Sequence, residues 1–180
     1  MNSSSVGYQD AASHHGDNNF ISLSSLESAI DQVKKSCLGH DELISIMEDL
    51  ADYLNDYPGR EVIGLENKLI RGSRHDLIER ATILKNRFAR RVAKDQMSLV
   101  EQTVYIQILS AISTNWHQYV YPAIICGCNN MEVDRLVMEE IISPVHRAII
   151  RFDNTITTEL VSGMLYFLTG LCHIKWEAKC

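Results

Sequence analysis

Three cysteines and one histidine are the residues of this chain best suited to chemistry. Cys126 and Cys128 flank a glycine, and Cys172 is followed directly by His173. If folding brought the two pairs together, three thiolates and an imidazole would form a chemically sound tetrahedral zinc set. The spacing is not that of a familiar zinc module, and the apolar residues before Cys126 favour cysteines buried as small hydrophobic side chains. Metal binding by these four residues is left open, and we expect no cofactor.

Catalysis by a Cys172–His173 pair is disfavoured, because adjacent residues seldom aim their side chains at one another and no orienting acid is evident. The chain also has no Gly-rich phosphate loop, no GxSxG, no HExxH and no convincing acid–base pair. We therefore expect a protein that is not an enzyme and works through its surfaces.

A stripe of cations is the second chemical feature. Its members are Arg80, Arg87, Arg91 and Lys94, which fall beside the apolar face of one predicted helix. Such a stripe could follow a phosphate backbone, which makes a helical DNA-binding module the alternative function. No aromatic residues interleave with these cations, and no recognised DNA-reading motif is present. An acidic partner is the competing interpretation, either another subunit or the segment Asp41–Asp56, which holds six acids and no base.

Composition excludes several classes of protein. The formal net charge is −6, which argues against general affinity for nucleic acid over the whole surface. The chain has five cysteines, an odd number, and no secretory signal precedes them. We therefore expect no disulfide framework, and we expect a cytoplasmic location. No apolar run approaches the roughly 20 residues that span a bilayer. A chain of 180 residues is long enough for one domain with a substantial core.

The stretch Ser162–Trp176 must organise the fold, because no other part of the chain combines so much apolar mass with so few charges. Its apolar positions follow helical spacing. Gly163 would let another element come close, and Gly170 is placed where a helix often ends in a left-handed residue. The tail that follows carries Trp176, whose indole needs to be buried.

The rest of the chain predicts further helices and no strands. Pairs of the capping type, Ser73 with Asp76 and Ser98 with Glu101, precede two of them. We predict an all-α fold, a single-domain orthogonal or bundle-like array of about six to eight helices, with residues 1–20 as a disordered tail and 21–180 as a helical interaction domain. The predicted helices cover about 24–37, 41–57, 65–70, 76–95, 98–121, 131–143, 145–152 and 155–170.

A resemblance is carried by the segment GMLYFLTGLCHIKW at positions 163–176. It looks like the closing motif of C-terminal domains found in effector proteins of the ABC-three-component systems, bacterial conflict systems built around an ATP-binding-cassette or chromosome-maintenance-like ATPase. The similarity extends back to about Leu65, through LENKLIRGSRHDLIERATILKNRFAR, MSLVEQTVYIQILSAI and VYPAIICG. It covers roughly two thirds of the chain, and the final motif is its most specific part.

The resemblance implies a non-catalytic assembly or adaptor subunit of an antiviral defence complex, which docks an effector to the ATPase and to a small middle component. In that family an effector domain usually precedes this one; here none does, and the sequence leaves open whether the effector is a separate chain or was removed. Contact with DNA within the complex and homo-oligomerisation are also left open. The residues expected to form or support the docking surface are Tyr166, His173, Lys175 and Trp176. Trp176 as a simple core plug is the competing interpretation.

Overall fold

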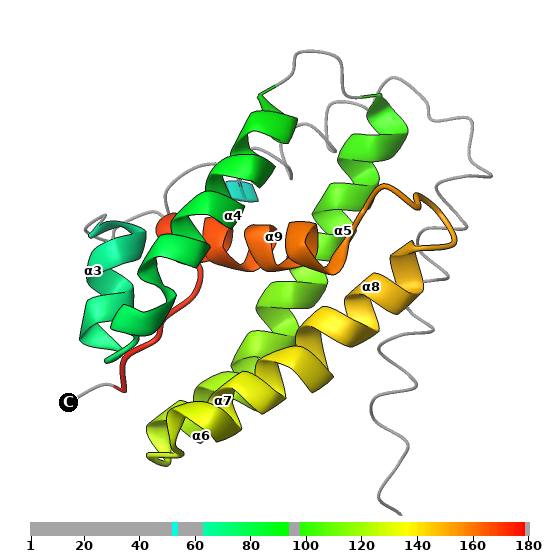
Figure 1. The fold of residues 1–180 in the computed structure, drawn as a ribbon. Coiled ribbons are helices and arrows are strands. Elements are labelled where there is room, and N and C mark those ends of the chain that lie inside the picture. The colour runs from blue at the N-terminus through cyan, green and yellow to red at the C-terminus, as the bar shows by residue number, and fades with distance from the viewer. Residues whose placement is uncertain (1–51, 54–62, 94–97, 179–180) are drawn as a thin grey trace, which may run out of the picture.

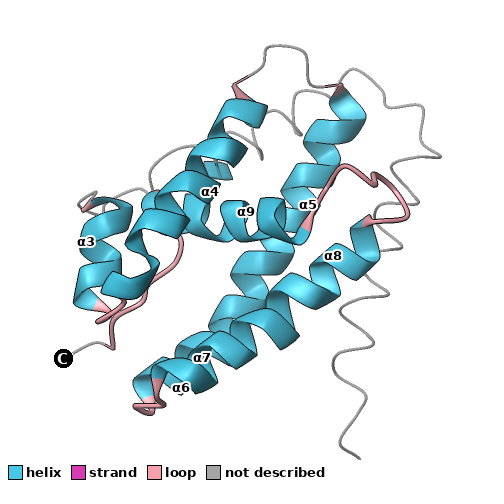
Figure 2. Ribbon diagram, in the orientation of Figure 1, coloured by secondary structure: helices cyan, strands magenta, loops and turns pink. Residues whose placement is uncertain are grey.

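The computed structural model describes residues 52–53, 63–93 and 98–178, and this part of the chain is helical without strands (Figure 2). It forms five continuous helical segments, two of which contain short π-helical stretches. In chain order the elements are α3 (Gly64–Arg71), the 3₁₀ turn η1 (His75–Leu77) with α4 (Ile78–Val92), α5 (Leu99–Asn115) with η2 (Trp116–Val120) and α6 (Tyr121–Ile125), α7 (Asn130–Leu136) with η3 (Val137–Ile142) and α8 (Ser143–Ile149), and α9 (Thr158–Gly170).

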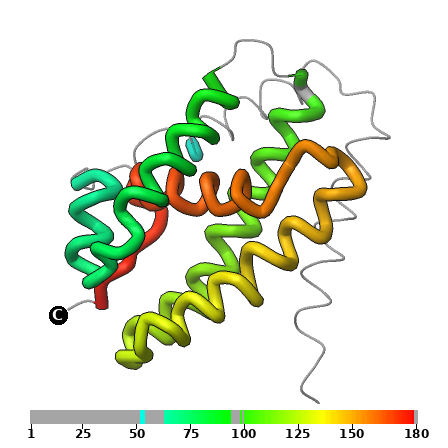
Figure 3. Tube along the Cα trace, viewed as in Figure 1, coloured from blue at the N-terminus to red at the C-terminus, as the bar shows by residue number. Residues whose placement is uncertain are grey.

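Two long helical segments form an antiparallel hairpin that supports the rest of the fold (Figures 1 and 3). The first runs from α5 through η2 to α6, and the second from α7 through η3 to α8. Gly127 has a φ of 76° at the turn between them, where a residue with a side chain would be strained. Asn129 then caps α7, since its Oδ1 accepts a hydrogen bond from the Glu132 amide at 2.9 Å.

The two π-helical stretches, η2 and η3, lie against each other within this hairpin. Asn115 lies at the end of α5, is 4 % exposed, and donates from Nδ2 to the backbone oxygen of Glu140 in η3 at 2.8 Å. A π-helical turn shifts the regular hydrogen-bond ladder by one residue. The Asn115 side chain therefore gives the Glu140 carbonyl a partner from the opposite helix.

Helix α9 crosses the hairpin and packs along α4 (Figure 1). The contact is close at Gly163, where an added Cβ would lie 2.5 Å from the backbone oxygen of Leu84. Phe88 on α4 meets Phe167 on α9 and Tyr105 on α5 edge-on, with ring centroids 5.1 and 5.8 Å apart. One apolar core therefore joins α4, α5 and α9, as the apolar periodicity of the three segments predicts.

Several local predictions are confirmed. The capping box at the start of α5 has both of its hydrogen bonds, with Ser98 Oγ and the Glu101 carboxylate as acceptors. The close approach at Gly163 is present. Helix α3 spans Gly64–Arg71, which matches the short helix predicted from about Leu65.

Other local predictions are wrong. Ser73 does not cap α4; it has a φ of 55° and lies in the turn that closes α3, where its amide bonds the Ile70 carbonyl. Gly170 remains helical, and the left-handed residue is Cys172, with a φ of 68°. The chain reverses two residues after the predicted position because the amides of Cys172 and His173 bond the Thr169 and Leu168 carbonyls.

Some predictions fall outside the described residues or are not confirmed. The predicted tail at residues 1–20, the helix at about 24–37, the helix at about 41–57 apart from the helical residues 52–53, and Lys94 lie in parts of the chain that the structure does not describe. The all-α fold is confirmed for the described part, whereas the count of six to eight helices is not. No helix among the described residues is long and apolar enough to cross a membrane.

Candidate functional site

The segment Leu171–Glu177 packs against α3 and the core, and Trp176 is its anchor. The Trp176 side chain is buried, and its ring centroid lies 4.7 Å from that of Trp116. Its indole Nε1 donates to Thr169 Oγ1 at 3.1 Å, and that hydroxyl donates to the Leu165 carbonyl at 3.0 Å. The indole nitrogen is therefore satisfied inside the core.

Helix α3 holds the same segment from the other side. Lys68 is 3 % exposed, and its Nζ donates to the carbonyls of Thr169 at 2.6 Å and Ile174 at 3.1 Å. Gly72 touches the segment so closely that a Cβ there would lie 2.7 Å from both Cβ and the backbone oxygen of Trp176. A larger residue at position 72 cannot fit without displacing the Trp176 backbone.

Arg74 fixes this site to the hairpin. Its side chain is 2 % exposed, its guanidinium carbon lies 5.4 Å from the centre of the Trp176 ring, and its nitrogens reach Asp76 at 3.2 Å and Asp134 of α7 at 2.8 Å. Burial disfavours the charged guanidinium, but hydrogen bonds and attraction from the two carboxylates outweigh it and raise the pKa of Arg74. The arginine hydrogen bond in turn lowers the pKa of Asp76.

We refer to Arg74, Asp76 and Asp134 as the Arg74 clasp. Sequence reasoning did not single it out, because one arginine among the nine cations of residues 68–94 has no distinguishing spacing. The available signal was its place directly after the Gly72-Ser73 turn, outside the periodic pattern of the helix that follows. Burial of an arginine side chain is rare without paired acids, and here both acids are present.

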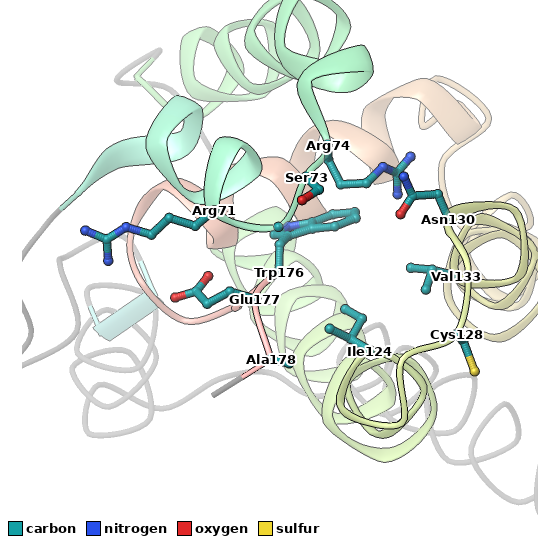
Figure 4. A pocket seen from close by; sticks show the side chains of 11 residues that line it. Arg71, Ser73, Arg74, Ile124, Cys128, Asn130, Val133, Trp176, Glu177 and Ala178 are labelled. Atoms are coloured by element: carbon teal, nitrogen blue, oxygen red, sulfur yellow. The ribbon is translucent and has the colours of Figure 1, made fainter. Parts of the chain in front are cut away.

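A pocket of about 220 Å³ opens beside the clasp and the indole (Figure 4). Ser73, Asn130 and Glu177 contribute polar atoms to it, while Ile124 and Val133 of the hairpin contribute apolar ones. Arg74 has both carboxylates as partners, so its charge is not available to a ligand in the pocket. The arrangement suits mechanical support of the C-terminal segment.

The four residues predicted to form or support the docking surface divide into two kinds. Tyr166 and Trp176 are buried, at 8 % and 3 % exposure, and burial raises the pKa of the Tyr166 hydroxyl. His173 and Lys175 are half-buried and line the outer side of the segment. His173 packs against Tyr53, with ring centroids 5.7 Å apart. The structure thus gives Trp176 and Tyr166 core positions, with their rings stacked 6.4 Å apart, and leaves His173 and Lys175 partly exposed.

Two members of the predicted cation stripe have acidic partners within the same chain. Arg87 pairs with Glu159 of α9 at 2.6 Å. Arg91 pairs with Asp153 at 3.0 Å, donates to Thr155 Oγ1 at 3.0 Å and lies over the Tyr105 ring. Arg80 is exposed. The acidic residues that pair with these arginines lie in the α8–α9 connection and in α9, and sequence reasoning did not consider them as partners.

The structure does not bring the cysteine pairs together. No group of three histidine, cysteine or acidic side chains that could hold a metal occurs among the described residues. Cys172 is buried, whereas Cys126 and Cys128 are both exposed at the end of the hairpin. The interpretation of these two cysteines as buried small hydrophobic residues is therefore wrong. The reason is that they occupy the turn itself, beyond the last residues that contact the core.

Comparison with known protein families gives a match to this chain. A family model described as C-terminal domain 9 of the ABC-three-component (ABC-3C) systems matches residues 64–176. The match begins at the first residue of α3 and ends at Trp176, so it covers more than half of the chain and the candidate site as far as Trp176. No curated protein and no solved structure matches the chain.

Proposed function

Because the chain belongs to the family of C-terminal domain 9 of the ABC-three-component systems, we propose that it is a non-catalytic assembly subunit that docks an effector to the ATPase of such a system. The family match over residues 64–176 is the observation that carries this proposal. The ATPase is of the ATP-binding-cassette or chromosome-maintenance-like type, and a small middle component belongs to the same complex. The complex acts in antiviral defence.

The local structure supports a role through surfaces. Trp176, Lys68 and the Arg74 clasp hold the C-terminal segment rigidly, with its polar side chains on the outside. A segment that is already ordered loses little conformational entropy when a partner binds. We assign the docking contact to His173 and Lys175, with Tyr166 and Trp176 as the support beneath them.

Co-expression of the full chain with the ATPase and the middle component of its ABC-three-component system tests this function. We expect the chain to co-elute with the ATPase in size-exclusion chromatography at low salt. Recovery of the chain as a lone monomer, while the other components assemble with each other, would overturn the proposal.

A charge reversal tests the assigned surface. Lys175→Glu is expected to weaken co-elution at least tenfold, because opposite charge at a docking contact costs affinity, while the packing of His173 against Tyr53 is left in place. Arg147→Glu is the matched control, since Arg147 is exposed on α8, away from the C-terminal segment (Figure 1). Thermal unfolding of both variants should match that of the wild type, which separates lost contact from lost fold.

A further inference from the structure

The end of the hairpin carries an unusual share of exposed apolar side chains. Six large hydrophobic residues are exposed in the described part of the chain, and three of them, Ile125, Met131 and Met138, lie within α6, α7 and η3. Met131 is 79 % exposed and Met138 is 51 % exposed. Single exposed apolar residues are ordinary on protein surfaces, but a group of them on one element marks a contact surface.

Met131 and Met138 share one side of their helix. They are seven residues apart on one continuous helical segment, and although this segment is π-helical from Val137 on, about two turns separate them, so both lie on the same broad stripe. Arg135 lies between them on that stripe, and it bonds Glu132 at 2.6 Å and also the carboxylate of Glu139. We call these five residues the methionine face. Their side chains are all substantially exposed, and the sequence analysis did not assign them a role.

The charge around the methionine face is acidic. Residues 129–142 contain four carboxylates and one cation, Arg135, and one of these carboxylates, Asp134, is paired with Arg74. Arg135 lowers the pKa of Glu132 through their hydrogen bond, so both groups are ionised at neutral pH. Two acids on the face against one arginine leave an excess of negative charge. A second copy of the same face would bring like charges together, which disfavours self-association there.

We infer that the methionine face docks a basic amphipathic helix of a partner protein. The two methionines are flexible and polarisable, so they adapt to apolar residues presented at helical spacing on the partner. The exposed carboxylates of Glu132 and Glu139 accept hydrogen bonds from lysine or arginine side chains that border that apolar stripe. This inference rests on the proposed function as an assembly subunit, and it names a second surface, separate from the C-terminal segment.

The probe is a fluorescein-labelled 18-residue helical peptide with leucines on one face and lysines on its flanks, measured by anisotropy against the full chain. We expect saturable binding that weakens as salt rises. Met131→Ser with Met138→Ser should raise the dissociation constant at least tenfold. Ile83→Ser on α4, where Ile83 is 52 % exposed, is the matched control and should leave binding unchanged. Glu132→Gln with Glu139→Gln should flatten the salt dependence.

Three outcomes would overturn the inference. One is equal loss of peptide binding in the methionine variant and in Ile83→Ser. Another is equal binding of a peptide whose lysines are replaced by glutamates. The third is a concentration-dependent dimer in sedimentation that the methionine substitutions abolish, since the occupant would then be a second copy.

The two proposals fail separately. A wild-type chain that co-elutes with the ATPase but does not bind the peptide refutes the methionine face alone. A chain that binds the peptide through Met131 and Met138 but never co-elutes with the ATPase refutes the proposed function alone.

Discussion

At the scale of single residues, the two glycines of α9 differ in whether the packing leaves room for a side chain. Gly163 lies where a Cβ would be 2.5 Å from a backbone oxygen of α4, a distance that side-chain rotation cannot relieve. At Gly170 a Cβ would meet the nearest side-chain atom, Cδ of Lys85, at an ordinary 3.5 Å. One glycine is required by packing, and the other is not.

Alanine substitutions test this difference. Gly163→Ala should destabilise the protein by about 1–3 kcal/mol, because α4 and α9 must separate to admit the methyl group. Gly170→Ala should be neutral or stabilise by up to about 1 kcal/mol, since alanine restricts the unfolded chain and fits the helix. Urea unfolding of both variants measures the two changes. Equal destabilisation by the two substitutions would contradict the close packing of α4 on α9.

At the scale of elements, the hairpin depends on one buried amide. The Asn115 side chain joins α5 to the Glu140 carbonyl of η3 at the level where the second helix is π-helical. Sequence reasoning did not foresee the π-helical stretches, because they shift the backbone without changing the apolar pattern. Helix identity and the apolar face were predictable from periodicity; the register of the backbone hydrogen bonds was not.

Removal of that amide should loosen the hairpin. Asn115→Ala leaves the Glu140 carbonyl without its partner in a buried setting, which we expect to cost about 1–3 kcal/mol of unfolding free energy. Gln118→Ala is the matched control, since Gln118 is an exposed amide in η2 and should change stability by less than about 0.5 kcal/mol. Hydrogen exchange would place the extra opening of Asn115→Ala in η2 and η3. Unchanged exchange there would show that the hairpin does not rely on Asn115.

At the scale of the whole molecule, the Arg74 clasp connects the α3–α4 turn, the hairpin and the C-terminal segment. Sequence reasoning identified the C-terminal segment and Trp176, because the apolar composition and the motif of the segment can be recognised from the sequence alone. It missed the clasp, because Asp134 lies 60 residues from Arg74 in the chain and neither residue stands out from its neighbours. Contacts between distant polar residues depend on the packing of elements, which composition and periodicity do not specify.

The clasp predicts a loss of stability in acid. The pKa of Asp76 is lowered in the folded state, so its contribution is fully present above its unfolded pKa of about 3.9 and is lost as pH falls through the lower folded value. Because the Asp76 side chain is 59 % exposed, solvent screening limits the contribution to at most about 1 kcal/mol.

Urea unfolding at pH 7 and pH 3 measures this contribution. The wild type should lose more stability between the two pH values than Asp76→Asn does. Glu79→Gln, which changes an exposed carboxylate of α4, is the control and should retain the wild-type pH dependence. An identical acid response in Asp76→Asn and the wild type would show that the clasp does not draw on the Asp76 charge.

The position of the C-terminal segment in the chain has a consequence for biosynthesis. Leu171–Trp176 leaves the ribosome after every described helix that it touches, so Lys68 and Thr169 meet their final partners late. Until then the nascent domain exposes the apolar groove that Trp176 fills, and chaperones bind surfaces of this kind. The apolar core of the domain is therefore complete only once the last residues of the matched region have been made.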